Sequence, residues 1–390
     1  MGAGFLRLVL RAASLGYSGV VRLRNLLYDK GWLRTHRVNA VVLSVGNITA
    51  GGTGKTPLVI WLCNLLKQKN IRRAILTRGY KACRAPPRMR SVSDEGGTQT
   101  AIRNTLTDEP AILAQTCPEA KIAMNPDRLA GAMEMVNMFG TEALVMDDGF
   151  QHRRLARDLD IVTIDATVPF GYGRLLPAGL LREPVTALKR ADAAVITRCD
   201  QIGEAELSRL EEKLRFINSD MIITKSIHAP VCVKYPEPSA IPAKAGIQKD
   251  AEGIDSRLRR NDSLDRLKGK RIFAFCGIGN PKAFMVTIES LGGVLAGSRI
   301  YDDHHHYSRQ GLAEICHQAK QSGAELILTT EKDYCKIAAL QMRAEDVSLA
   351  YLVVRVQFTA GQDQLTALIE STIAGKIPDK PEKKDQGPKL

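Results

Sequence analysis

Short apolar runs alternate with amphipathic segments along the middle of this 390-residue chain. The runs are rich in β-branched residues, and the segments between them repeat apolar positions at helical spacing. The predicted strands are Val41–Val45, Arg73–Thr77, Ala143–Met146, Asp160–Ile164 and Ala193–Thr197. The predicted helices are Leu58–Lys67, Glu109–Thr116, Asp127–Met138 and Glu204–Phe216. Such alternation predicts an α/β fold with a doubly wound parallel sheet, whose ligands bind at the carboxyl ends of the strands.

A second, smaller α/β domain is predicted from Arg271 onward. Its elements are strand Ile272–Cys276, a helix from about Phe284 to Leu291, and strands Leu326–Thr330 and Ala350–Val356. Gly277-Ile278-Gly279 is too short for a dinucleotide fingerprint and is typical of a tight strand-to-helix turn. We therefore expect a first domain over 38–225, a linker over 226–270 and a second domain over 271–375. The tail 376–390 is polar and has no periodicity, so we expect it to be disordered.

Residues 1–37 mix apolar side chains with seven basic residues and one acid. The longest uncharged stretch, Ala12–Val21, is far shorter than the roughly 20 residues that span a bilayer. The segment therefore predicts a basic amphipathic helix that lies on a membrane surface. An ordinary core helix and a signal peptide are the alternatives; Arg7 and Arg11 interrupt the apolar region that a signal peptide needs.

Charge and cysteine usage narrow the possible partners. A formal net charge of +13 indicates an anionic partner, which could be nucleic acid, acidic lipid or a phosphorylated substrate. The chain shows no basic groove interleaved with aromatic residues, so we expect no nucleic-acid partner. Eight cysteines without a C-x-x-C pair indicate neither a zinc site nor a disulfide framework.

A glycine-rich stretch, Asn47–Pro57, lies between the first predicted strand and the first helix. Its three glycines let backbone N–H groups turn toward a phosphate chain, next to the positive end of the helix dipole. Lys55 would reach the β- and γ-phosphates, and Thr56 would bind Mg²⁺. The P-loop consensus has Gly where this chain has Thr49, so the match is one position short. The predicted nucleotide-binding residues here are Thr49, Ala50, Gly51, Gly52, Thr53, Gly54, Lys55 and Thr56.

Acidic residues end the apolar run Ala143–Met146. Asp147 and Asp148 have the form of a Walker B element, which holds Mg²⁺ opposite the phosphates. The alternative is a turn capped by an aspartate. Gln151 and His152 follow closely and are expected near the phosphates, without an assigned role.

Two further polar segments leave their chemistry open. Thr107-Asp108-Glu109-Pro110 reads on its own as a helix start with acidic residues in the first turn. Asp302–His306 holds three adjacent histidines, which favour three interpretations: a metal site, an exposed loop, or a histidine that acts with a carboxylate in proton transfer.

These segments, taken together, resemble the tetraacyldisaccharide 4′-kinases, the lipid A kinases of Gram-negative bacteria. The resemblance runs from the N-terminal helix to about Ile373 and includes a P-loop NTPase fold. Its motifs are Val45–Pro57, Thr107–Pro110, Asp147–His152, Leu176–Gly179, Leu181–Glu183, Gly277–Gly279, Asp303–Tyr307 and Thr330–Asp333.

The resemblance implies a reaction and a set of roles. The ATP γ-phosphate would pass to the 4′-hydroxyl of a tetraacylated glucosamine disaccharide 1-phosphate, at the cytoplasmic face of the inner membrane. Asp108 would be the general base and His304 its partner. The residues implied around Mg²⁺ are Thr56, Asp147, Asp148 and Glu183. Those implied to neutralise phosphate charge are Lys55, Arg128 and Arg182.

A different class of protein shares the glycine-rich stretch. Partitioning and metallochaperone ATPases carry a similar loop, and they switch conformation instead of phosphorylating a small molecule. They typically have Lys where this chain has Ala50. A switch ATPase is therefore the alternative function.

One segment has no counterpart in the kinase family. Residues 239–263 resemble translated repetitive intergenic elements of bacterial genomes. We expect an in-frame insertion that forms a surface excursion and carries no catalytic residue, because lengthening a surface connection costs little entropy.

Overall fold

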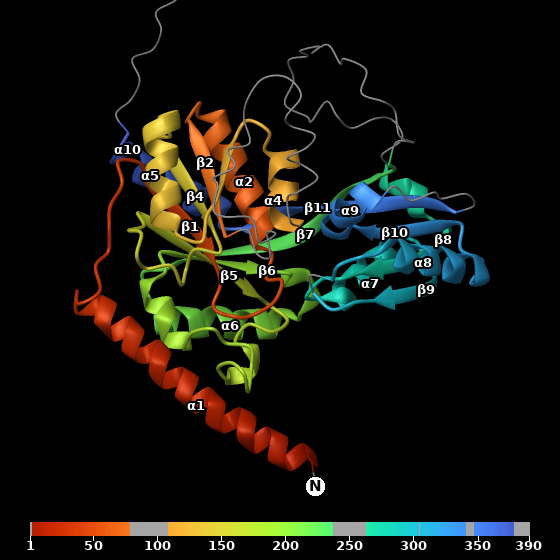
Figure 1. The fold of residues 1–390 in the computed structure, drawn as a ribbon, viewed down its shortest axis with the longest axis horizontal. Helices are drawn as coiled ribbons and strands as arrows, with labels where there is room; N and C mark the ends of the chain where they lie inside the picture. Colours follow the sequence, from red (N-terminus) through yellow and green to blue (C-terminus); the bar gives the residue numbers. More distant parts are fainter. Residues whose placement is uncertain (1, 79–107, 237–262, 304, 341–346, 378–390) are drawn as a thin grey trace, which may run out of the picture.

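A single sheet of 11 strands runs through the described part of the chain in this computed structural model (Figure 1). The structure describes residues 2–78, 108–236, 263–303, 305–340 and 347–377. The strand order is β3-β2-β4-β1-β5-β6-β7-β11-β10-β8-β9. All neighbours pair in parallel except β7 and β11. The predicted α/β fold with a large, mostly parallel sheet is thus confirmed.

The first half of the sheet has helices on both faces. Its strands are β1 (Val41–Gly46), β2 (Arg73–Thr77), β3 (Lys121–Met124), β4 (Ala143–Asp147), β5 (Leu159–Asp165) and β6 (Ala193–Thr197). Its helices are α2 (Lys55–Gln68), α4 (Asp108–Thr116), α5 (Arg128–Phe139) and α6 (Glu204–Ile217). Alternate residues of β1 point to opposite faces, so Val41 and Leu43 pack under α2 while Val42 packs under α5.

The second half is built in the same way around five more strands. They are β7 (Ile222–Lys234), β8 (Arg271–Cys276), β9 (Val294–Ile300), β10 (Leu326–Thr330) and β11 (Ser348–Ala360). The helices are α7 (Pro281–Ser290), α8 (Arg309–Gln321), α9 (Glu331–Ile337) and α10 (Gln362–Ala374). Short 3₁₀ turns lie at Gly171–Gly173, Val185–Arg190, Cys199–Gln201, Leu264–Leu267 and Ala338–Leu340. Ile272 packs under α7, and Phe273 on the opposite face packs under α8.

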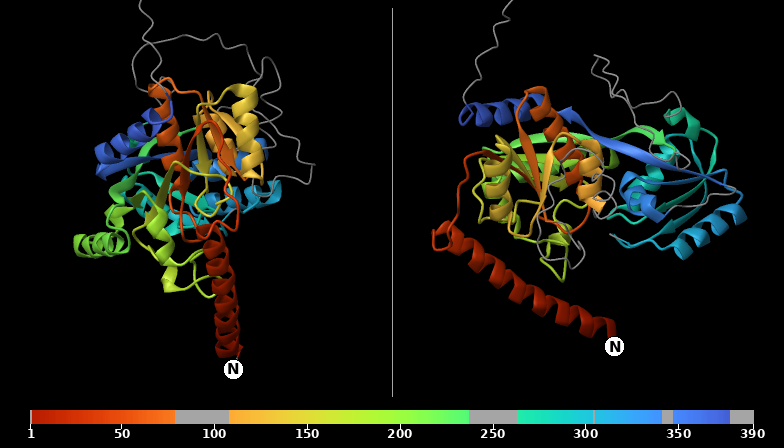
Figure 2. Two further views of the ribbon diagram at one scale, coloured as in Figure 1. Left: turned by 90° about the vertical axis from the view of Figure 1, so that its left-hand side faces the viewer. Right: turned by 45° about the horizontal axis from the view of Figure 1, so that its top comes forward.

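The two halves are joined by strand pairing and by a shared core. Residues 226–234, expected in the linker, form most of β7, which pairs antiparallel with β11. Helix α10, expected in the second domain, packs Leu365, Ile369 and Ile373 into the core under α2 (Figure 2). Both differences arise from pairing between segments that lie far apart in sequence.

The first helix, α1 (Gly2–Asp29), extends beside the body of the molecule (Figures 1 and 2). Phe5, Leu8 and Leu15 on it are more than 60% exposed. Among the described helices, none is long and apolar enough to cross a bilayer. Attachment of this helix to a membrane surface remains a prediction.

Predicted and observed elements agree best where the chain is apolar. The predicted strands all exist, and those of the first half match within one residue at either end. Strands β3, β7 and β9 were not predicted: β3 has four residues, β7 lies mostly in the expected linker, and β9 is an exposed edge that contains Gly297 and Arg299. The predicted insertion lies outside the described residues apart from Ser263. So does the predicted tail apart from Lys376, which pairs with Asp158, and Ile377, which packs against the core.

Candidate active site

A cavity of about 770 Å³ opens at the carboxyl ends of β1 and β4, between the two halves of the sheet. Parallel pairing sets Val45 beside Asp147, so the glycine-rich stretch and the acidic strand end leave the sheet side by side. From the second half, Gly279 and Lys332 complete the lining.

The glycine-rich loop lines this cavity from residue 50 to residue 57. Gly51 has φ 115° and Gly54 has φ 87°, a left-handed region that favours glycine. A Cβ at Gly54 would also collide with the ring of His228. Thr53 ties the loop to β5, because its hydroxyl lies 2.7 Å from that of Thr163. Thr49 does not line the cavity; it is buried and pairs with Leu181.

Helix α2 begins at Lys55, directly after the loop. The Lys55 ammonium lies 3.4 Å from an Asp148 oxygen, and Thr56 lines the cavity. The N-terminal end of α2 therefore faces the same space as the loop, which is the arrangement that binds anions.

The two adjacent aspartates differ in protonation. Burial, with the neighbouring Glu109 and Asp148 charges, raises the pKa of Asp147 to about 7. Burial also raises the pKa of Asp148, but Lys55 and Arg182 outweigh it and hold that pKa well below its ordinary value. Arg182 donates to both Asp148 oxygens, at 3.0 and 2.8 Å. Asp148 is therefore ionised, whereas ionising Asp147 costs free energy.

Arg128 faces the carboxylates from the first turn of α5. It donates to the backbone oxygens of Asn125 (2.7 Å) and Asp147 (3.3 Å). Burial lowers its pKa to about 10, against the opposing effect of Asp147 and Asp148. The guanidinium stays charged at neutral pH and lines the cavity.

Gln151 and His152 both line the cavity, and the structure gives the first a clear contact. The Gln151 amide donates to the backbone oxygen of Asn47 at 2.8 Å, which ties it to the start of the glycine-rich stretch. Burial and the nearby Arg128 lower the pKa of His152. The imidazole is therefore neutral at physiological pH.

Glu183 does not reach the cavity. Its side chain is 1% exposed, and its oxygens accept from Arg24 (2.9 Å), Asn25 (3.1 Å) and Arg190 (2.7 Å). Thr56, Asp147 and Asp148, with which the resemblance grouped it, all line the cavity, whereas Glu183 does not.

The proposed base and its partner are only partly described. Helix α4 begins at Asp108, whose side chain lies outside the description, as does all of His304. Their neighbours Glu109, Asp303 and His306 line the cavity. Within the described ranges, no group of three His, Cys, Asp or Glu side chains is close enough to hold a metal ion.

The sequence analysis missed two residues at this edge. Burial and Arg198 lower the pKa of His228, on β7, to about 3, and its buried Nε2 has no hydrogen-bond partner among the described residues. Arg198 follows β6, forms a buried ion pair with Asp165 and donates to the backbone oxygen of Gly52 at 2.8 Å. The rule that ligands bind beyond the carboxyl ends of parallel strands could have pointed to Arg198. No local signal marks His228.

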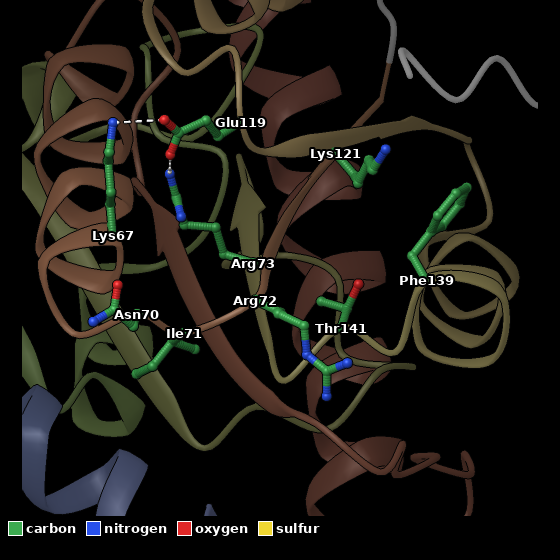
Figure 3. Close-up of a pocket in the computed structure, with 9 residues that line it drawn as sticks. All are labelled: Lys67, Asn70, Ile71, Arg72, Arg73, Glu119, Lys121, Phe139 and Thr141. Atoms are coloured by element: carbon green, nitrogen blue, oxygen red, sulfur yellow. Dashed lines mark hydrogen bonds and ion pairs between the residues drawn. The ribbon is translucent and has the colours of Figure 1, made fainter. Parts of the chain in front are cut away.

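A second hollow, of about 400 Å³, lies at the opposite ends of the strands (Figure 3). Lys67 and Arg73 share the Glu119 carboxylate there, at 2.8 and 3.4 Å. Lys121 lies over the ring of Phe139, 5.1 Å from its centre. This hollow has neither the glycine loop nor a carboxylate pair, so it is not the candidate site.

A family model described as tetraacyldisaccharide-1-P 4′-kinase matches residues 6–374. The chain belongs to this family. Among curated relatives, the tetraacyldisaccharide 4′-kinase of Anaeromyxobacter sp. (strain K) is 35% identical, covering 95% of this chain and 91% of its own. The same kinase of Syntrophus aciditrophicus (strain SB) is 38% identical over 90% of this chain and 89% of its own. Membership makes the chain a tetraacyldisaccharide 4′-kinase of lipid A biosynthesis.

A solved structure shows the same fold. LpxK from Aquifex aeolicus, whose crystal structure is described as an "apo" form in complex with ATP, superposes with a TM-score of 0.66. It is 28% identical, and the match covers 94% of this kinase and 99% of that chain.

Proposed function

We propose that this kinase transfers the γ-phosphate of ATP to the 4′-hydroxyl of a tetraacylated glucosamine disaccharide 1-phosphate. The observation that carries the proposal is the cavity in which the glycine-rich loop, Lys55 and the Asp147–Asp148 pair converge. The ATP named for the Aquifex structure supports this choice of donor. The buried Nε2 of His228 beside Gly54, which has no hydrogen-bond partner in the described part of the chain, also fits a site completed by a polar ligand.

The residues present fit a magnesium ion. Mg²⁺ prefers oxygen ligands and is commonly held by one or two carboxylates together with substrate phosphates. The carboxylates of Asp147 and Asp148 and the hydroxyl of Thr56 would hold it. Asp147 is buried and costly to ionise, so an adjacent cation would favour its charged form. The bound ion would supply charge neutralisation of the phosphates. Glu183 is not included among these ligands, because its oxygens accept from Arg24, Asn25 and Arg190.

Positioning and charge neutralisation would do most of the catalysis. Lys55, Arg128 and Arg182 surround the place where the phosphates would lie. A sugar hydroxyl is a poor nucleophile, so a base must accept its proton in the loose transition state. Asp108 at the start of α4 would be that base, with His304 as its partner, because their neighbours Glu109 and Asp303 line the cavity.

We further propose that α1 seats the enzyme on the cytoplasmic face of the inner membrane. Exposed apolar residues on this helix, Phe5, Leu8 and Leu15 among them, would enter the interfacial region. Its basic residues would meet anionic headgroups. The substrate carries acyl chains, so a kinase on this surface meets it where it resides.

The test is product analysis. Purified enzyme is given ATP, Mg²⁺ and detergent-dispersed disaccharide 1-phosphate, and ADP, inorganic phosphate and lipid are quantified. Equal amounts of ADP and 4′-phosphorylated lipid are expected. Release of inorganic phosphate without a lipid product would instead support the switch ATPase.

A further inference from the structure

Residues 180–183 form a short strip against the start of the glycine-rich stretch. The Ala50 N–H donates to the oxygen of Leu180 at 2.6 Å. The Arg182 N–H donates to the oxygen of Ile48 at 2.7 Å, and Thr49 pairs with Leu181 between these bonds. Any displacement of this strip would therefore displace the entrance of the phosphate-binding loop.

The other side of the strip is held by α1. The Tyr17 hydroxyl donates to the backbone oxygen of Arg182 at 3.0 Å. The guanidinium of Arg24 and the amide of Asn25 both donate to Glu183, at 2.9 and 3.1 Å. Helix α1 thus docks onto residues 180–183 through the buried Glu183 carboxylate and the Arg182 backbone oxygen.

Arg182 joins these contacts to the chemistry. It lies next to Glu183 and donates to both oxygens of Asp148, which in turn faces Lys55. Both bonds come from one nitrogen, Nη1, which must therefore lie between the two Asp148 oxygens. A shift of the Glu183 backbone would move the adjacent Arg182 and with it this contact.

We propose that Glu183 is a positioning residue rather than a magnesium ligand: through Arg24 it docks α1 and thereby fixes Arg182 against Asp148. Binding a metal would require Glu183 to give up the hydrogen bonds that it accepts from two guanidinium groups and an amide. A helix that seats on a lipid surface is in this way tied to the phosphate site. This inference rests on the proposed function.

The decisive experiment compares the magnesium dependence of matched variants with ATP and the dispersed lipid. Arg24→Met and Glu183→Gln should each lower kcat about 10- to 100-fold, as outer supports of a metal site do. The double variant should be no worse than the worse single, because the two residues act as one unit. The Mg²⁺ concentration for half-maximal rate should stay within about twofold in all three, an allowance for indirect effects.

Control variants separate docking from general damage. Arg215→Met, at an exposed position of α6 that does not line the cavity, should keep wild-type kcat. Arg24→Lys keeps the charge and should recover most of the activity lost in Arg24→Met. Tyr17→Phe removes one hydroxyl and should lower kcat less than Arg24→Met, which keeps the test usable if Glu183→Gln fails to fold.

Two results would overturn the inference. One is a tenfold or larger rise in the Mg²⁺ requirement of Glu183→Gln with no such rise in Arg24→Met, which would make Glu183 a ligand. The other is wild-type kcat in Arg24→Met. If the wild-type enzyme itself makes no phosphorylated lipid, the proposed function has failed instead.

Discussion

Glu183 and Asp147 are both buried carboxylates, yet the protein surrounds them in opposite ways. Three side chains donate to Glu183, two of them guanidinium groups. Asp147 has carboxylates as neighbours, Glu109 and Asp148, besides Lys55 and Arg128, and burial raises its pKa to about 7. Glu183, which accepts from three side chains, anchors α1 to residues 180–183. Asp147, which lies among other carboxylates, leaves its negative charge to be neutralised by a bound cation.

The largest expected effect comes from removing Lys55, the cation beside Asp148. Lys55→Met takes away the ammonium 3.4 Å from Asp148 and the charge that would contact the phosphates throughout the reaction. We expect kcat/KM to fall by about 10³-fold or more, because one preorganised charge contributes that much in a dry site. Steady-state kinetics would measure it. Lys67→Met, at the exposed far end of α2, is the matched control and should stay within about twofold.

The next largest effect is expected at Asp108 and tests whether this residue is the general base. Asp108→Asn should lower kcat by about 10²–10⁴-fold through loss of the base, with the ATP Kd nearly unchanged. His304→Ala should lower kcat less, and the double variant should match the worse single. Wild-type turnover in Asp108→Asn would leave this residue as a helix cap only.

Asp147 should also make the stability of the protein depend on pH. The pKa of Asp147 in the folded, nucleotide-free enzyme lies above its ordinary value, so its contribution to stability is complete below about pH 4 and is lost as the pH rises through about 7. Asp147→Asn should therefore gain about 1–3 kcal/mol in free energy of unfolding relative to wild type between pH 5 and pH 8. Urea unfolding at the two pH values measures this.

Glu183→Gln is the counterpart in that experiment. It breaks a buried ion pair and should be less stable than wild type at both pH values. A relative gain at pH 8 equal to that of Asp147→Asn would remove the distinction between the two acids.

The smallest effect is expected from an exposed acid. Glu119 pairs with Lys67 and Arg73 in the second hollow, and its side chain is more than half exposed. Exposed ion pairs contribute about 0–1 kcal/mol. Glu119→Gln should therefore change the free energy of unfolding by less than about 1 kcal/mol and leave kcat unchanged. A loss of activity would show that this hollow communicates with the cavity.

Local pattern was enough to predict the strands of the first half other than β3, the glycine-rich loop and the acidic end of β4. Each of these depends on residues adjacent in sequence: an apolar run, a set of glycines, a carboxylate pair. The same local pattern missed β3 because four residues, one of them Lys121, are too few to show a period.

Long-range pairing could not be predicted from the sequence. The join of β7 to β11 and the docking of α10 bring together segments more than 100 residues apart. The position of Glu183 has the same cause. A glutamate after Arg182 reads identically whether it faces the cavity or α1, and only the fold shows that Arg24 takes it.

The protonation of Asp147 offers the most direct test of the central claim, that a bound cation converts this carboxyl to its ionised form. Calorimetric titration of the enzyme with Mg²⁺ and a non-hydrolysable ATP analogue, in two pH 7 buffers of different ionisation enthalpy, counts the protons released on binding. A pKa of about 7 means that the carboxyl is about half protonated there. Wild type should release about half a proton more than Asp147→Asn, because a ligand must be deprotonated. Equal proton release from the two proteins would contradict the account.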